Sequence, residues 1–432
     1  MVRGARTGRV ALAAVLVALS GCFWQQPGAG PGHTGHNPHE TRLGEWSAVG
    51  GAWSVQLDGP VGDPVTSGAG VHVAAGRTAY GFDVFSGDEL WRHEEAAPMA
   101  LLPPIAHGDQ VVVNRWNPTA TEATDPSGAD AARFLDAATG AVEDEVEGTF
   151  LGWRGSRALL RTVNHMRLGR PMFAVWAEGL HVRDLPSGDE VCCSGLSGLN
   201  AGGPTATPPP PPPLTLGSEW IVESGPGVVD VAVPAQLPAN GLRGYPIEGA
   251  APCPIPTVAL CPAWALPFDG TTSTVPVLDD AETTAYVGTD AGTLYAVDLA
   301  THTVRWSKAV GSAITAPPAL RVDVLYVPTA SGDLVVLDAG TGGEVARWPG
   351  TGSALTVQPA VTGAGLVITG DADGTVAGFA RCRPGQPFCL PTWTIEFGSP
   401  ITGAPAVSNG MIHVGTEDGR LFTLTSRGSV GS

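Results

Sequence analysis

The stretch 275–306 reads VPVLDDAETTAYVGTDAGTLYAVDLATHTVRW, and it decides the fold. It opens on a Pro-containing segment and passes through an apolar strand to a Gly turn at residues 290–292. An alternating strand follows at 293–298, then a second turn at 298–302, and the stretch ends on Trp306. Strand, Gly turn and strand together are typical of a β-hairpin.

The same pattern recurs through the C-terminal half of the chain. Four segments align, at residues 275–298, 317–338, 358–380 and 404–425. The tryptophans Trp264, Trp306, Trp348 and Trp393 follow one another at intervals of 42, 42 and 45 residues. A period of roughly 40–45 residues, read as four short strands, indicates one blade of a β-propeller.

The two ends of the chain complement each other. The last repeat ends near residue 427 without a Trp strand, whereas an unused strand, Trp53-Ser54-Val55-Gln56, precedes the first full repeat at Trp91. An N-terminal strand that joins the last blade would remove an open sheet edge. Between Trp91 and Trp264 the period blurs, and long insertions account for the excess length. The sequence thus predicts an all-β, eight-bladed propeller of four-stranded antiparallel blades, with seven or nine blades still open.

Composition supports this class and excludes others. Gly and Pro make up 98 of 432 residues, which disfavours helical bundles because these two residues are the poorest helix formers. Hydrophobic residues at 43 % are too many for a disordered chain. The net charge of −18 disfavours binding to the phosphate backbone of nucleic acids.

The N-terminus resembles a bacterial lipoprotein signal. Arg3, Arg6 and Arg9 precede the apolar run 10–19, which leads into Leu19-Ser20-Gly21-Cys22. We expect a signal peptide at 1–21, lipidation of Cys22, a flexible tether at 22–45 and the propeller at 46–432. The protein would then be extracytoplasmic and held at the cell membrane or the outer membrane. Three histidines, His33, His36 and His39, lie in the tether; a solvated stalk is favoured there over a metal site.

Six further cysteines suit an exported protein with disulfides. Cys253 and Cys261 stand where other repeats carry the second turn, and so do Cys382 and Cys389. We therefore expect disulfides Cys253–Cys261 and Cys382–Cys389. Cys192 falls on the Trp position of its repeat, beside Cys193. A strained vicinal disulfide and two separate thiols are both open for this pair.

The repeats resemble the pyrroloquinoline-quinone-type propeller repeat, whose ending is Ala/Leu-x-Asp-x-x-Thr-Gly-x-x-x-Trp. The resemblance rests on residues 296–306 and 337–348, covers about 46–432 and is strongest over 267–432. It implies that each repeat Trp (Trp53, Trp91, Trp264, Trp306, Trp348 and Trp393) docks between adjacent blades. Members of this family are either quinone-dependent alcohol and sugar dehydrogenases or non-enzymatic propellers, such as the BamB-type lipoprotein of outer-membrane assembly.

The resemblance also implies what a dehydrogenase would need. A tricarboxylate quinone calls for Arg or Lys in the central funnel, together with a calcium-binding carboxylate–Asn set and a catalytic Asp. The only lysine is Lys308, and no cluster maps onto those roles. Cys192-Cys193 alone echoes the family's vicinal disulfide. We therefore expect no catalytic, cofactor-binding or metal-binding residues, and a scaffold that binds an envelope or extracellular protein. A small-ligand or sugar sensor and a quinone dehydrogenase are the alternatives.

Overall fold

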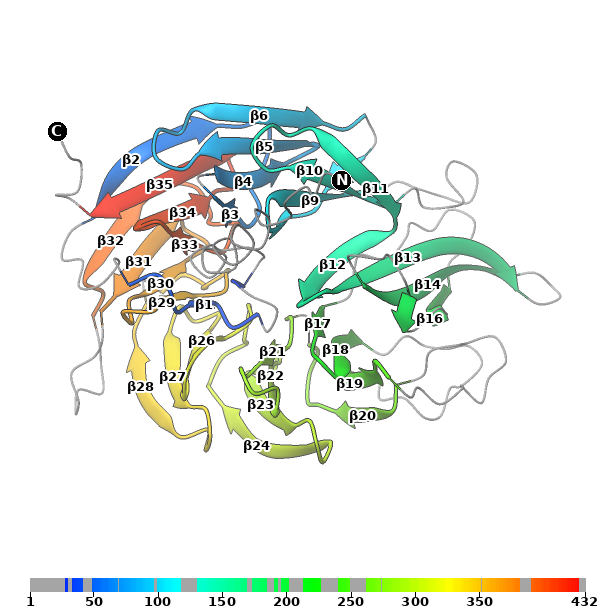
Figure 1. The fold of residues 1–432 in the computed structure, drawn as a ribbon. Helices are drawn as coiled ribbons and strands as arrows, with labels where there is room; N and C mark the ends of the chain where they lie inside the picture. Colours follow the sequence, from blue (N-terminus) through cyan, green and yellow to red (C-terminus); the bar gives the residue numbers. More distant parts are fainter. Residues whose placement is uncertain are drawn as a thin grey trace, which may run out of the picture.

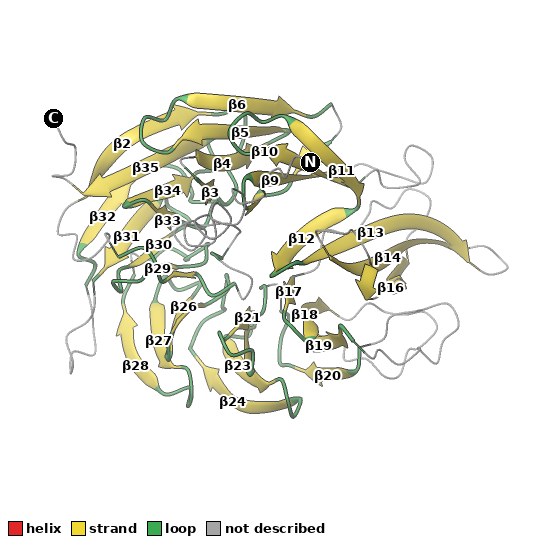
Figure 2. Cartoon of the chain, viewed as in Figure 1, coloured by secondary structure: helices red, strands yellow, loops and turns green. Residues whose placement is uncertain are grey.

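The structure is a computed structural model of the chain. It describes residues 28–29, 33–41, 49–68, 70–96, 99–117, 130–168, 173–184, 190–192, 196–201, 213–226, 240–248, 262–272, 274–350, 352–380 and 390–426. All regular structure in this part is β (Figure 2). Over the same residues, no helix has the length and apolar character needed to cross a membrane.

Eight small sheets stand around a central axis (Figure 1) and confirm the eight-bladed propeller. Blades 1 to 4 hold, in turn, β3 (Val65–Ser67), β4 (Gly70–Ala75), β5 (Thr78–Asp83) and β6 (Glu89–Glu94); β7 (Ala100–Leu101), β8 (Ile105–His107), β9 (Gln110–Trp116), β10 (Ala131–Asp136) and β11 (Val142–Glu147); β12 (Thr149–Arg154), β13 (Arg157–Leu168), β14 (Phe173–Asp184), β15 (Glu190–Cys192) and β16 (Leu196–Ala201); and β17 (Leu214–Leu216), β18 (Trp220–Pro226), β19 (Asn240–Pro246) and β20 (Trp264–Pro267).

Blades 5 to 8 come from the regular half of the sequence. They hold, in turn, β21 (Val277–Leu278), β22 (Thr284–Gly288), β23 (Thr293–Asp298) and β24 (Thr303–Ala309); β25 (Ala319–Arg321), β26 (Val324–Pro328), β27 (Leu334–Asp338) and β28 (Glu344–Trp348); β1 (His36–Asn37), β29 (Ala360–Thr362), β30 (Val367–Gly370), β31 (Thr375–Phe379) and β32 (Trp393–Glu396); and β33 (Ala406–Ser408), β34 (Met411–Gly415), β35 (Arg420–Ser426) and β2 (Val49–Gln56).

The first strand of each blade lies innermost, and several of these strands contact the innermost strand of the next blade, as β3 does with β8 and β33. This arrangement defines two faces. The mouth face carries the segments that enter the innermost strands and the turns between second and third strands. The far face carries the turns between first and second strands and those between third and fourth strands.

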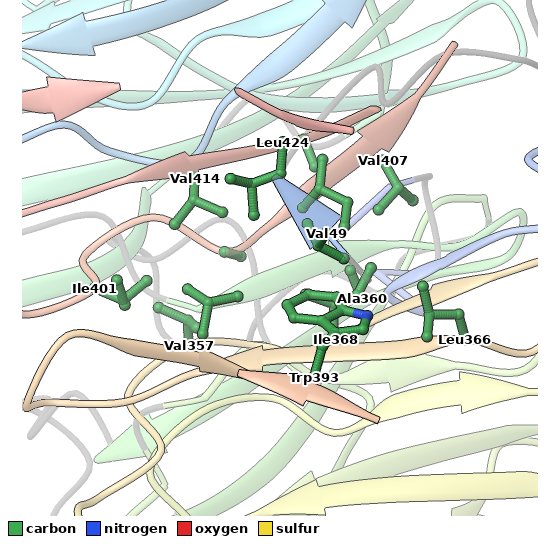
Figure 3. Close-up of a cluster of buried hydrophobic side chains, with 14 residues drawn as sticks. Val49, Val357, Ala360, Leu366, Ile368, Trp393, Ile401, Val407, Val414 and Leu424 are labelled. Atoms are coloured by element: carbon green, nitrogen blue, oxygen red, sulfur yellow. The ribbon is translucent and has the colours of Figure 1, made fainter. Parts of the chain in front are cut away.

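The core lies between blades rather than inside one. One cluster joins Ile368 and Trp393 of blade 7 to Val414 and Leu424 of blade 8, with Val49 from the N-terminal strand (Figure 3). Middle strands such as β4 are buried along their whole length, whereas the outermost β24 is largely exposed. Each middle strand is covered on both faces by neighbouring blades, which explains its nearly continuous apolar sequence.

The predicted ring closure is confirmed. β2 pairs antiparallel with β35, and Trp53 faces Thr423 across the ladder. Blade 8 is therefore built from both ends of the chain, and β2 completes it as the fourth, outermost strand.

The repeat tryptophans dock against the next blade around the ring. The indole N–H of Trp91 in blade 1 donates to the carbonyl of Ala137 in blade 2, over 2.9 Å. Trp53 and Trp306 make the same bond to Val84 and Ala339, each over 3.0 Å. Every acceptor directly follows the aspartate that opens the second turn. The indole thus fixes one blade to the turn of the next.

The glycine that ends the second turn serves the same contact. Gly140 has a φ of +69°, and a Cβ built there would lie 2.7 Å from atoms of the Trp91 indole. In blade 5 the equivalent position is His302, which takes a φ of +56°. Its ring stacks on Trp264, with centroids 5.1 Å apart. A small residue or a flat ring is what this position accommodates.

Trp348 does not share the register of the other repeat tryptophans. Trp306 faces Ala296, whereas the matching Val336 faces Ala346, and Trp348 lies two residues further along. The turn aspartates of these two blades are 40 residues apart and the tryptophans 42, so equal Trp spacing hides the shift. Trp348 instead stacks on Phe379 of blade 7, with centroids 4.6 Å apart.

The N-terminal segment departs from the expectation of a flexible tether. Residues 33–41 lie in the central channel, where β1 pairs in parallel with the innermost strand β29 of blade 7 (Figure 1). Asn37 is buried and donates through Nδ2 to the Val407 carbonyl over 2.9 Å. The backbone edge of an innermost strand offers hydrogen bonds to any extended segment, so this pairing requires no apolar period that could be recognised in the sequence.

Candidate functional site

Of the concave places in the described part, two are the candidate sites: the channel mouth and a pocket on the far face. Another, of about 400 Å³, lies between blades 8 and 1 beside Tyr80 and Arg92. The mouth is a cavity of about 260 Å³. It is lined by the segments that enter the innermost strands of blades 1 and 5–8, and by Gly28 and His33 of the N-terminal segment.

Threonine hydroxyls at the mouth form hydrogen bonds between neighbouring blades. The hydroxyl of Thr356 donates to the Ile401 carbonyl over 3.0 Å, and that of Thr402 donates to the Val61 carbonyl over 2.8 Å. Each bond joins one blade to the next, because the acceptor holds the same position one repeat later. The Ile-Thr or Leu-Thr dipeptide before these prolines is therefore structural, because its threonine hydroxyl already donates a hydrogen bond to the next blade.

Two other polar side chains give the mouth its chemistry. Gln358 donates through Nε2 to the carbonyls of His33 (2.6 Å) and Pro318 (2.9 Å), and so clamps the N-terminal segment against blades 6 and 7. Asp63 accepts the backbone N–H of Ala404 over 2.6 Å, across the seam between blades 1 and 8. It lies deep in the ring yet retains surface toward the channel.

Burial raises the pKa of Asp63 to about 6. A carboxyl whose pKa is raised in the folded state loses stabilisation as the pH rises from about 4 through 6. Asp63→Asn keeps the acceptor for Ala404 but does not ionise. We expect it to raise the free energy of unfolding at pH 7.5 by about 1–3 kcal/mol, and to leave it unchanged at pH 3.5.

Urea unfolding at the two pH values measures this difference. Asn in place of the exposed Asp144 controls for the loss of one negative charge. Equal effects of the two substitutions at pH 7.5 would show that Asp63 is not held in a costly charged state.

The second concave place is a pocket of about 690 Å³ on the far face, between blades 3 and 4. Arg157 forms one wall, where its guanidinium donates to the Ser218 carbonyl over 3.1 Å and to Glu248 over 2.9 Å. Trp220 forms another wall and meets Trp264 edge to face, with centroids 6.0 Å apart. Volume and mixed lining both fall within the range of ligand or side-chain recognition sites.

An ion pair closes the inner end of this pocket. Arg154 of blade 3 pairs with Glu282 of blade 5, and the same carboxylate accepts the Ser218 hydroxyl of blade 4 over 2.8 Å. Three blades thus meet at one side chain. Glu282 has a φ of +53°, so its turn is held in a conformation that a non-glycine residue rarely adopts.

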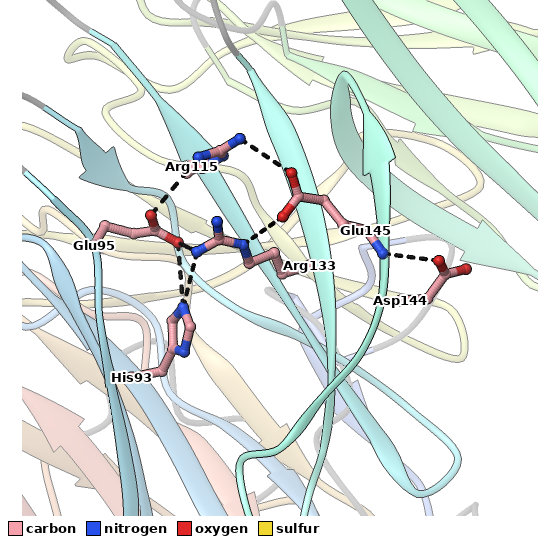
Figure 4. Close-up of polar contacts among 6 residues, drawn as sticks. All are labelled: His93, Glu95, Arg115, Arg133, Asp144 and Glu145. Carbon is pink, nitrogen blue, oxygen red and sulfur yellow. Dashed lines mark hydrogen bonds and ion pairs between the residues drawn. The ribbon is translucent and has the colours of Figure 1, made fainter.

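A third polar cluster joins blades 1 and 2 but is structural. Glu95 is buried and receives Arg133 and His93, while Arg133 also donates to Glu145 over 2.6 Å (Figure 4). The Arg133 hydrogen bond lowers the pKa of Glu145. Each of these charges has an opposite partner, so the cluster leaves no group free to act on a ligand.

The described mouth does not fit a tricarboxylate quinone. Its described lining holds no Lys or Arg, and Asp63 would face the ligand's carboxylates. No group of three or more candidate metal ligands occurs within the described ranges. The clamped N-terminal segment also takes up part of the space.

Cys22, Cys193, Cys253, Cys261, Cys382 and Cys389 lie outside the described residues. The backbone of Cys192 faces Val182, just as that of Trp91 faces Gly81, each two residues before the turn aspartate. The pairing of these cysteines and the lipidation of Cys22 stay predictions.

Comparisons with known proteins agree with the fold. Residues 262–382 match the family described as outer membrane protein assembly factor BamB. None of the curated proteins matches the chain in sequence.

Solved structures of both functional kinds share the architecture. Quinohemoprotein alcohol dehydrogenase from Comamonas testosteroni superposes with a TM-score of 0.66 at 12 % identity, over 99 % of this chain and 83 % of that one. A europium-containing methanol dehydrogenase gives 0.62 at 11 %, over 95 % and 100 %. BamB from Moraxella catarrhalis gives 0.53 at 17 %, over 89 % and 99 %. The chain is therefore an eight-bladed β-propeller, and its residues 262–382 are similar to the BamB family.

Proposed function

We propose that the protein is a lipid-anchored extracytoplasmic scaffold that binds another protein of the cell envelope. The observation that carries this proposal is the channel mouth, where the chain's own N-terminal segment is clamped and where the described lining carries the Asp63 carboxylate in place of the cations that a quinone would need. The match of residues 262–382 to the BamB family supports the same class. The basic, apolar and Cys-containing N-terminus supports the anchor.

The far face supplies the candidate docking surface. It carries the pocket beside Trp220, and large apolar side chains are exposed on its turns: Phe85 at 56 %, Val322 at 71 % and Leu390 at 78 %. A pocket with an aromatic wall suits an apolar anchor residue of a partner, and the exposed apolar turns of other blades extend the same face. The Arg157–Glu248 pair at the rim is solvent-exposed, so a partner carboxylate could replace Glu248 at little cost.

Filling the pocket tests this surface. Ser156 is exposed in the pocket lining, and Ser156→Trp occupies the space without removing any contact described above. We expect it to reduce recovery of the crosslinked partner by tenfold or more, the loss that about 1.4 kcal/mol produces. The measurement is crosslinking in the native envelope, purification through a C-terminal tag and quantitative mass spectrometry.

Ala138→Trp is the matched control, because Ala138 is exposed on a far-face turn of blade 2 away from the pocket. Equal recovery with both variants would reject the pocket as the docking site. Cys22→Ser should release the protein from membranes; retention there would reject the lipid anchor.

The pocket also supports a second candidate function, which the same variants test. Its size and its indole wall suit a small ligand such as a sugar. If no protein is enriched over the Cys22→Ser control, binding of oligosaccharides to the purified propeller, lost in Ser156→Trp, would favour the sensor instead.

A further inference from the structure

The course of the N-terminal segment through the channel fixes which way the ring faces. Gly28 and His33 lie at the mouth, where the innermost strands begin. The Thr34 carbonyl accepts the N–H of Leu320 in blade 6, and the Gly35 carbonyl accepts that of Val361 in blade 7. The segment therefore enters the channel from the mouth face.

The segment then runs the length of the innermost strands. β1 is parallel to β29, with His36 facing Val361 and Asn37 facing Thr362. At the other end Glu40 is buried and reaches the far-face turns, where its carboxylate accepts the N–H of Gly410 over 2.8 Å. Its carbonyl accepts the N–H of Gly363 over 3.0 Å. The chain thus passes from the mouth face to the far face inside its own ring.

From this path we infer that the mouth face is turned toward the membrane and the far face away from it. The inference rests on the proposed lipidation of Cys22. Five residues separate Cys22 from Gly28, and the six residue steps between the two span at most about 22 Å when the chain is fully extended. Whatever conformation residues 23–27 take, the anchored lipid lies within that distance of the mouth.

The far face is out of reach of the anchor. A chain leaving the mouth would first have to cross a blade, about 14 Å from inner to outer strand at the usual strand spacing. It would then have to descend the side of the ring, about 20 Å for a six-residue strand. The sum exceeds the available length. The far-face pocket beside Trp220 is consequently presented to the space beyond the membrane.

Energy transfer to labelled lipid headgroups tests the orientation. A coumarin amino acid replaces either Glu417, exposed on a mouth-face turn of blade 8, or Phe85, exposed on a far-face turn of the adjacent blade 1. The lipidated full-length protein is reconstituted into phosphatidylcholine vesicles that carry an acceptor on their headgroups. We expect transfer from position 417 to be several-fold more efficient than from position 85.

A second variant isolates the role of the threaded segment. The double substitution Asn37→Ala and Glu40→Ala removes two buried hydrogen-bonding side chains from the channel but leaves the anchor intact. The tether is thereby lengthened, and the difference between the two positions should disappear. If the difference in energy transfer between positions 417 and 85 persists, the threaded segment is not what orients the ring.

The outcomes also separate the orientation from the anchor. Co-flotation with vesicles but equal transfer from both positions, or stronger transfer from position 85, would overturn the orientation alone. Failure to float, as expected for Cys22→Ser, would overturn the anchor and with it the orientation.

Discussion

Gly140→Ala should destabilise the propeller by about 2–5 kcal/mol. The left-handed backbone, with a φ of +69°, costs an alanine about 1–2 kcal/mol by itself. The added Cβ would also meet the Trp91 indole at 2.7 Å, and overpacking of this kind costs about 1–3 kcal/mol more. Trp91 cannot move away freely, because its N–H is bonded to Ala137 of the next blade.

Gly108 in the same blade provides the matched control. It has a φ of +64°, yet a Cβ built there meets nothing within 4 Å. Gly108→Ala should therefore show the backbone cost alone, and urea unfolding of both variants measures the difference. If both substitutions cost the same, the second-turn glycine serves only the backbone and the indole contact between blades contributes nothing.

Acid should destabilise the protein well before its carboxylates are fully protonated. His72 in blade 1 and His413 in blade 8 occupy matching positions in the second strand, and both are fully buried. Burial lowers the pKa of each to about 3. His72 Nδ1 and His413 Nε2 have no hydrogen-bond partner among the described residues, so protonation would bury an unpaired N–H.

The lowered pKa of these histidines determines how the free energy of unfolding changes with pH. The stabilisation is complete above the ordinary histidine value near 6.5 and is lost as the pH falls from there toward 3. At pH 5 each histidine costs about 2 kcal/mol relative to pH 8. His36, whose pKa is lowered to about 4, adds to this loss. Asp63 acts in the opposite direction between pH 4 and 6.

His413→Gln tests this loss of stability in acid, because glutamine can still form a hydrogen bond with Thr423 but does not titrate in this pH range. We expect it to remove about 2 kcal/mol of the difference between pH 8 and pH 5 in urea unfolding. His39→Gln at an exposed site is the control. An unchanged difference in the His413 variant would mean that the buried imidazole is protonated without cost.

The sequence was informative wherever the repeat was regular. Turn and strand patterns in residues 275–425 predicted blades 5 to 8, and the unpaired Trp53 strand predicted the closure by β2. Trp348 shows the limit of spacing alone. The turn aspartates of blades 5 and 6 are only 40 residues apart, but Trp348 lies two residues further from its turn than Trp306 does, so the tryptophans are still 42 residues apart. Periodicity counts residues, whereas register depends on where each turn ends.

The sites were less predictable. The clamp by Gln358 and the strand β1 depend on backbone groups of residues more than 300 positions away, and neither leaves a local pattern. The far-face pocket joins turns of blades 3 and 4, where insertions blur the repeat.

The threaded segment also determines how the molecule bears mechanical load. A pull on the N-terminal end acts along β1, parallel to β29, so the bonds around His36 and Asn37 are sheared together rather than opened one by one. The buried side chains of Asn37 and Glu40 resist the same displacement. Only after this segment has been drawn out of the channel does tension reach β2, the strand that closes the ring. The joint that completes the propeller is thereby shielded from forces applied at the N-terminal end.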